Sequence, residues 1–83
     1  MLSYVISDLL SGRYLISPYK KTNKYKEIFN NVVNVINKVN NDENLNSEEK
    51  TLLYNMTILF YEGLPDMCEQ LSINKENLVK LLN

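Results

Sequence analysis

The acidic side chains in the middle of this sequence are its most obvious candidates for chemistry. Four carboxylates lie close together, namely Asp42, Glu43, Glu48 and Glu49. Neighbouring carboxylates can serve as general acid and base or as ligands for a hard cation. Here they fall in a polar loop and at an expected helix start, where solvation and helix capping account for them. We therefore predict no catalytic or metal-binding role for this cluster.

Other catalytic residue types are scarce. The chain has 83 residues and no histidine, so it lacks the side chain that most often moves protons near neutral pH. Cys68 is the only cysteine, and without a neighbouring base it is expected to be a small buried residue. The sequence has no glycine-rich phosphate loop and no Cys/His spacing for zinc. We expect a protein that is not an enzyme and that binds no cofactor or metal.

Length and composition predict a single helical domain over residues 1–83. Hydrophobic residues make up 45% of the chain, which argues against disorder, and only two Gly and two Pro occur, which argues against a turn-rich β fold. No apolar run reaches the roughly 18 residues of a membrane helix, and the first residues do not have the pattern of a signal peptide. Together with the single cysteine, these features predict a cytoplasmic protein without membrane insertion. The frequent Asn, Ile and Lys favour a bacterial, phage or viral origin.

Hydrophobic periodicity predicts an all-α bundle of four to five short antiparallel helices. A first helix is expected to stop near Gly12, and the second helix has the clearest apolar stripe. That stripe consists of Tyr25, Ile28, Phe29, Val32, Val35, Ile36 and Val39. Short connections favour antiparallel neighbours, so the second helix is expected to pack antiparallel to the third.

Local capping signals mark the remaining helices. Asn46 and Glu49 have the spacing of a capping box at the start of the third helix, which is expected to run to about Glu62 and to end at Gly63. Pro65 suits the first turn of a fourth helix. Asn74 is a suitable N-cap for a fifth.

Charge is distributed unevenly along the chain, although the net charge is only −1. Residues 1–41 contain six Lys or Arg and two Asp or Glu, whereas residues 42–83 contain three and eight. Opposite charges of this kind can attract within one molecule, between two copies or toward a charged partner.

Two segments are candidates for binding a protein partner. The third helix is apolar on nearly every side, so it is either fully buried or carries an exposed site that includes Tyr54, Ile58 and Tyr61. An exposed remainder would suit a protein partner or a homodimer. The basic stretch that contains Lys20, Lys21 and Lys24 is either a solvated connector or a surface that steers an encounter.

The C-terminal residues 64–83 resemble the helix-turn-helix of DNA-binding repressors. Cys68 occupies the place of that motif's small residue, Ser72 stands where the motif usually has glycine, and Asn74 would cap the recognition helix. The apolar places are matched by Met67, Leu71, Ile73, Leu78 and Leu81. The resemblance implies DNA contacts from Lys75, Glu76, Asn77 and Lys80. A purely structural helix pair gives the same pattern, and because the segment lies in the acidic half, nucleic acid is the less favoured partner.

Residues 8–62 resemble the immunity proteins that protect producers of pediocin-like (class IIa) bacteriocins. The resemblance covers a short first helix, a connector ending in Lys24-Tyr25-Lys26, a long second helix and a tyrosine-rich third helix. It implies a small cytosolic four-helix bundle, although that family usually has a longer fourth helix and a C-terminal tail. The sequence therefore favours a non-enzymatic binder of a protein partner, as an inhibitor, immunity or regulatory protein. The alternative is a helix-turn-helix transcriptional regulator that uses residues 64–83.

Overall fold

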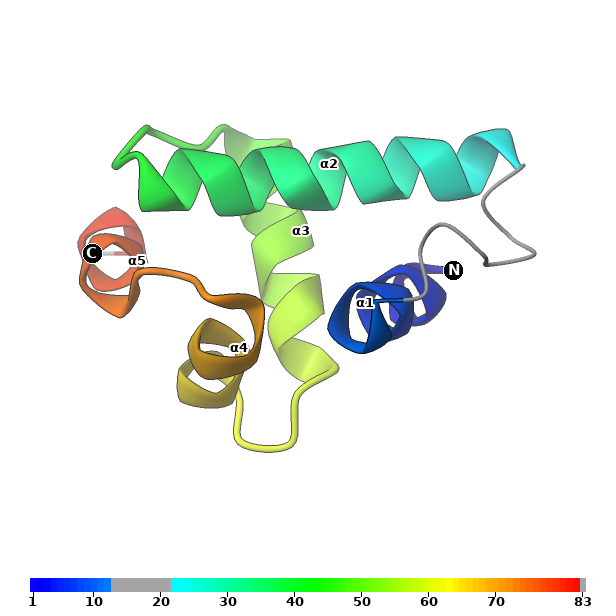
Figure 1. Cartoon of the computed structure of the whole chain (residues 1–83). Helices are drawn as coiled ribbons and strands as arrows, with labels where there is room; N and C mark the ends of the chain where they lie inside the picture. Colours follow the sequence, from blue (N-terminus) through cyan, green and yellow to red (C-terminus); the bar gives the residue numbers. More distant parts are fainter. Residues whose placement is uncertain (13–21, 83) are drawn as a thin grey trace.

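The computed structural model describes residues 1–12 and 22–82, and these residues form five α-helices (Figure 1). The helices are α1 (Leu2–Ser11), α2 (Asn23–Asn40), α3 (Ser47–Ile58), α4 (Leu64–Leu71) and α5 (Lys75–Leu82). The described part contains no β-strand. The all-α class and the number of helices predicted from the sequence are thus confirmed.

The predicted helix ends at Gly12, Asn46 and Asn74 are confirmed by their hydrogen bonds. Gly12 has φ 71° and closes α1 by donating its N–H to the Asp8 carbonyl, a left-handed conformation that costs glycine little. The Glu49 N–H donates to Asn46 Oδ1 at 2.8 Å and the Asn46 N–H donates to Glu49 Oε1 at 2.9 Å, which completes the capping box. Asn74 Oδ1 accepts from the Asn77 N–H at 3.1 Å at the start of α5.

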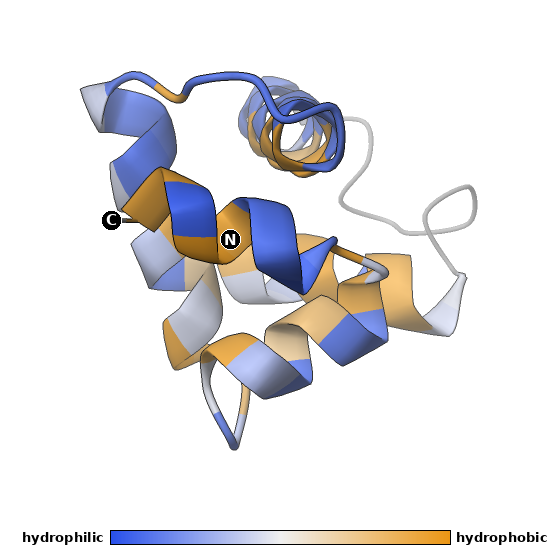
Figure 2. Cartoon of the chain, turned by 90° about the vertical axis from the view of Figure 1, so that its left-hand side faces the viewer, coloured by the Kyte–Doolittle hydropathy of each residue, from blue (hydrophilic) through white to orange (hydrophobic). Residues whose placement is uncertain are grey.

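The core is built around the apolar side of α2. Tyr25, Val32, Val35 and Val39 have no exposed surface. Viewed along α2 in Figure 2, one side of the helix is hydrophobic and faces the other helices, while the opposite side is hydrophilic. This one-sided burial is what the 3.6-residue period of the stripe predicts. No helix in the described ranges combines the length and the apolar character that a membrane crossing requires.

The helices do not all run antiparallel. α2 packs against α1, α3 and α5, and α3 packs in turn against α4. α2 lies horizontal in Figure 1 and end-on in Figure 2, whereas α3 descends from it in both views, so the two helices cross at a steep angle. Leu45, in the connection between them, is only 8% exposed. The connection therefore contacts the core through Leu45, while its other residues are exposed.

α3 ends at Ile58, earlier than the expected end near Glu62. The Leu59 N–H donates to the Met56 carbonyl and the Phe60 N–H to the Thr57 carbonyl. These three-residue hydrogen bonds tighten the chain, and they accompany the burial of Phe60, which is 7% exposed. Gly63, with φ 76°, is the N-cap of α4. The predicted role of Gly63 as the C-cap of the third helix is therefore wrong.

Candidate functional site

One side of α3 and the turn that follows it carries large exposed apolar side chains. Tyr54 is 51% exposed, Ile58 is 77% exposed and Tyr61 is 99% exposed. We call these three residues the α3 patch. Tyr54 and Ile58 are four residues apart on α3 and therefore share one helix face, and Tyr61 lies in the turn that follows. The alternative of a fully buried third helix does not hold for these positions.

The α3 patch is exposed because the core contacts the other side of the same helix. Leu53 and Met56 have no exposed surface, and Phe60 is nearly buried. Leu53 and Met56 are three residues apart and share a side of α3 that differs from the side carrying Tyr54 and Ile58. A helix that is apolar all round can bury only one side against a core of this size. The sequence alone could not select which side that would be.

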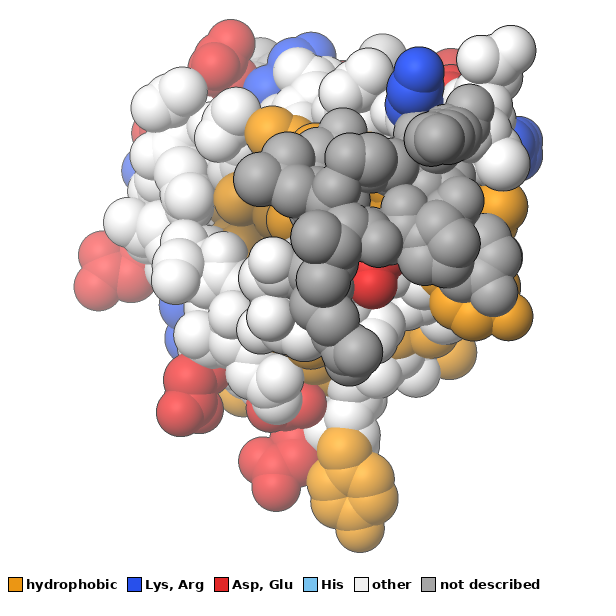
Figure 3. Space-filling model, turned by 45° about the vertical axis from the view of Figure 1, so that its right-hand side comes forward, with side chains coloured by type: hydrophobic (Ala, Val, Ile, Leu, Met, Phe, Trp, Pro, Cys, Tyr) orange, Lys and Arg blue, Asp and Glu red, His pale blue; other side chains and the backbone are white. Residues whose placement is uncertain are grey.

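The part of the chain that carries the α3 patch is acidic. Residues 51–74 contain Glu62, Asp66 and Glu69 and no Lys or Arg. Figure 1 places the turn after α3 at the bottom of the molecule, and Figure 3 shows acidic side chains there beside a projecting hydrophobic one. The patch is therefore an apolar surface with negative charge beyond the end that carries Tyr61, whereas Lys50 lies one helical turn before Tyr54 at its other end.

A shallow groove lies between α1 and the end of α3. It has a volume of about 410 Å³, and Leu10 and Leu59 on its wall are 43% and 41% exposed. Its other lining residues are Ser3, Ile6, Ser7 and Ser11. None of the three residues of the α3 patch lines this groove, and Leu59, the residue after Ile58, lines it from the end of α3.

The basic residues predicted to assist partner binding do not join the α3 patch. Lys20 and Lys21 lie outside the described residues. Lys24 is exposed near the start of α2. α2 lies at the top of Figures 1 and 2 and the turn after α3 at the bottom, so Lys24 and Tyr61 belong to different surfaces.

α4 and α5 are two short helices joined by a turn at Ser72, Ile73 and Asn74, at the positions of the C-terminal pattern. Ser72 adopts φ 57° and ψ 43°, the left-handed conformation suited to the glycine of that motif. Met67, Ile73 and Leu78 are buried between the helices and the core, and Cys68 is 7% exposed. The backbone of residues 64–82 is thus compatible with a helix-turn-helix motif.

Two of the four residues that the resemblance places on DNA are instead engaged with the end of α2 and the turn after it. Asn77 Nδ2 donates to the Val39 carbonyl at 3.0 Å and to the Asn40 carbonyl at 3.3 Å. Lys80 Nζ lies 3.1 Å from Asp42 Oδ2, and both side chains are half exposed or more. Lys75 is exposed on α5.

Asn40 joins the end of α2 to the turn before α5. Its Oδ1 accepts from the Asn74 N–H at 2.8 Å, and its Nδ2 donates to the Ser72 carbonyl at 3.3 Å. Sequence reasoning missed this contact, because residues 40 and 74 are distant in the chain and the capping signal at Asn74 concerns only its own helix. Together with Asn77, it makes the α4–α5 turn part of the folded core rather than an independent arm.

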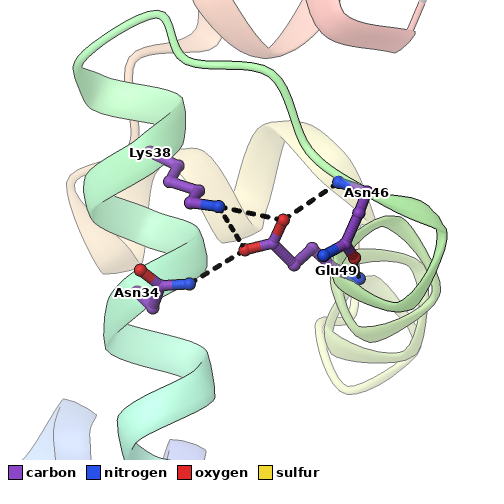
Figure 4. A network of polar contacts seen from close by, with 4 residues as sticks. All are labelled: Asn34, Lys38, Asn46 and Glu49. Carbon is purple, nitrogen blue, oxygen red and sulfur yellow. Dashed lines mark hydrogen bonds and ion pairs between the residues drawn. The ribbon is translucent and has the colours of Figure 1, made fainter.

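Glu49 connects α3 to α2 as well as capping α3 (Figure 4). Lys38 Nζ lies 2.8 Å from Glu49 Oε2 and 3.1 Å from Oε1, and Asn34 Nδ2 donates to Oε2 at 2.9 Å. The hydrogen bond from the Asn46 backbone, followed by the contact with Lys38, lowers the pKa of Glu49 from its usual 4.5. The expected capping role of this carboxylate is confirmed, and its inter-helix role adds to that.

Cys68 is the remaining residue with potential reactivity. Burial raises the pKa of its thiol, and the nearby positive charge of Lys75 opposes that rise. A buried thiol with a raised pKa is less reactive than an exposed one. In residues 1–12 and 22–82, no three His, Cys, Asp or Glu side chains are arranged to hold a metal ion.

Comparison of the chain with protein-family profiles, with curated protein sequences and with solved structures finds no match in any of the three.

Proposed function

We propose that this protein is a non-enzymatic binder that docks a protein partner on the α3 patch. The observation that carries the proposal is the exposure of Tyr54 and Ile58 on one side of α3 and of Tyr61 in the turn that follows it. Tyrosine is enriched among the residues that dominate binding energy, because it buries a large apolar ring and keeps a polar hydroxyl. A short helix that the core holds from its other side presents such residues with little loss of freedom on binding.

The proposal includes the setting that the sequence favours. The protein acts in the cytoplasm as an inhibitor, immunity or regulatory protein, which is also what the resemblance to the pediocin-like immunity proteins implies. A second copy of the chain is one candidate for the partner. Lys24 lies on another surface, so its part in this proposal is to steer the encounter at long range.

The test is an affinity capture from a lysate of the native host, with and without nuclease. The wild-type chain is compared with the double variant Ile58→Ser/Tyr61→Ser. A nuclease-resistant protein partner should be retained by the wild type and lost by the variant, with an affinity decrease of about tenfold or more. Because both residues are exposed, the thermal unfolding of the variant should match that of the wild type.

Val79→Ser is the matched control. Val79 is 48% exposed and lies on α5, away from the α3 patch. This variant should capture the partner as well as the wild type does. Equal loss of capture in both variants, or no loss in either, would remove the α3 patch from the proposal.

We propose DNA binding by residues 64–82 as the second candidate, favoured by the left-handed conformation of Ser72 in the turn. In that case Lys75 and Lys80 would contact phosphates, Asn77 would contact bases, and recovery of nucleic acid would be lost with nuclease. Lys75→Ala/Lys80→Ala should then weaken DNA binding and reduce its salt dependence by about one phosphate contact per lysine. A protein binder would be unaffected by this double substitution.

A further inference from the structure

The acidic surroundings of the α3 patch indicate the chemistry of its partner. Building on the proposed function, we infer that the patch binds a cationic amphipathic helix, with apolar side chains on the patch and Lys or Arg facing the acidic residues beside it. Nucleic acids and anionic lipid surfaces carry the wrong charge for this surface. The partner would therefore be a protein segment with a basic face.

No Lys or Arg of residues 1–12 and 22–82 forms an ion pair with the acidic side chains beside the patch. Among the described residues, Glu49 pairs with Lys38 and Asp42 pairs with Lys80. Glu62, which directly follows Tyr61, has no Lys or Arg within ion-pair distance in that part of the chain. The same holds for Asp66 and Glu69 on α4, which packs against α3. These carboxylates can therefore attract a cationic side chain of a partner without first breaking an ion pair with a described Lys or Arg of this protein.

The length of the patch suits a helical partner. Tyr54 and Ile58 are four residues apart on α3, which corresponds to about 6 Å or one turn along the helix, and Tyr61 lies in the turn beyond the helix end. A partner helix with apolar residues at positions i, i+3, i+4 and i+7 presents a stripe of about two turns, which can cover this helix face and reach toward Tyr61. The acidic residues lie at the turn and on α4, beyond one end of the patch, so basic residues are needed on the part of the partner that reaches the turn.

The experiment uses two synthetic helical peptides as probes. Both have the same leucine pattern, and their polar face carries lysine in one and glutamate in the other. The lysine peptide should bind the full-length protein at least about tenfold more tightly, and raised salt should weaken its binding. Binding is measured by fluorescence anisotropy of the labelled peptide.

Three variants separate charge from apolar contact. Glu62→Gln/Glu69→Gln should lower the affinity of the protein for the lysine peptide about fivefold, as expected for the loss of two exposed ion pairs. Glu27→Gln/Glu43→Gln makes the same change in net charge at exposed positions on α2 and in the loop after it, and should leave binding nearly unchanged. Tyr61→Ser should weaken the binding of both peptides.

Each contrary outcome has a distinct meaning. If both peptides bind equally and both depend on Tyr61, the α3 patch is a docking surface without charge preference, and the inference fails while the proposed function stands. If the two Glu→Gln pairs weaken the lysine peptide equally, its binding is a general effect of net charge and the inference fails. If Tyr61→Ser affects neither peptide, both proposals fail. If the protein dimerises as its concentration rises and the dimer depends on Tyr61, the partner of the α3 patch is a second copy of the chain, and the inference of a cationic helix fails.

Discussion

Asn77 offers the sharpest test of how α5 is held in the fold. Its side-chain amide donates two hydrogen bonds to the last carbonyls of α2, at 3.0 and 3.3 Å. Asn77→Ala removes both bonds, each with a net worth of about 0.5–1.5 kcal/mol. Alanine is the better helix former by about 0.6 kcal/mol, which offsets part of the loss. The expected net destabilisation is about 1 kcal/mol, or about 4–8 °C in Tm for a domain of this size.

The assay is thermal unfolding followed by circular dichroism, together with a urea titration. Asn37→Ala is the matched control, because it makes the same substitution at an exposed position within α2. The control loses no hydrogen bond from its side chain, so helix propensity should leave it as stable as the wild type or more stable by about 0.6 kcal/mol.

The reasoning would be refuted by equal shifts in Tm for Asn77→Ala and Asn37→Ala. That result would mean that the contacts of Asn77 with α2 add nothing to stability, and that its side chain is available for a ligand such as DNA. A selective loss at Asn77 would instead show that the helix pair at residues 64–82 uses this position to hold itself on the body of the protein.

Three further predictions concern the core, the α2–α3 connection and the α4–α5 turn. Leu53→Ala should lower the free energy of unfolding, measured by urea titration, by about 2–5 kcal/mol, because Leu53 has no exposed surface. A decrease of less than about 1 kcal/mol would contradict the central place of Leu53 in the core. The pKa of Glu49 is lower in the folded protein than its usual value of 4.5. The ionised Glu49 side chain therefore contributes fully to the free energy of unfolding above pH 4.5, and this contribution is lost as the pH falls through the lower pKa of the folded state. The stability difference between the wild type and Glu49→Gln should therefore be largest near neutral pH and shrink in acid, and a difference that does not change with pH would contradict the role of this charge. Ser72→Gly should raise stability by about 0.5–1 kcal/mol because Ser72 has φ 57°, and an unchanged or lower urea midpoint would argue against that backbone conformation.

The features predicted correctly from the sequence are those set by contacts between near neighbours. The stripe on α2 repeats every three or four residues, so any core on that side buries Tyr25, Val32 and Val39. The capping box at Asn46 and Glu49 needs only the two residues that form it. The cap at Asn74 is equally local.

Some aspects were decided only by the way the helices pack. α3 is apolar on nearly all sides, so its periodicity could not indicate which side faces the core. In the structure, α3 crosses α2 at a steep angle and ends early at Ile58, and Tyr54, Ile58 and Tyr61 are exposed. The contacts of Asn77 with α2 and of Glu49 with Lys38 join residues from different helices. Such partners are selected by the spatial arrangement of whole helices, because spacing along the chain determines which side a residue lies on but not which helix meets that side. The candidate site therefore depended on tertiary packing, whereas the positions of most of the helices could be predicted from the sequence.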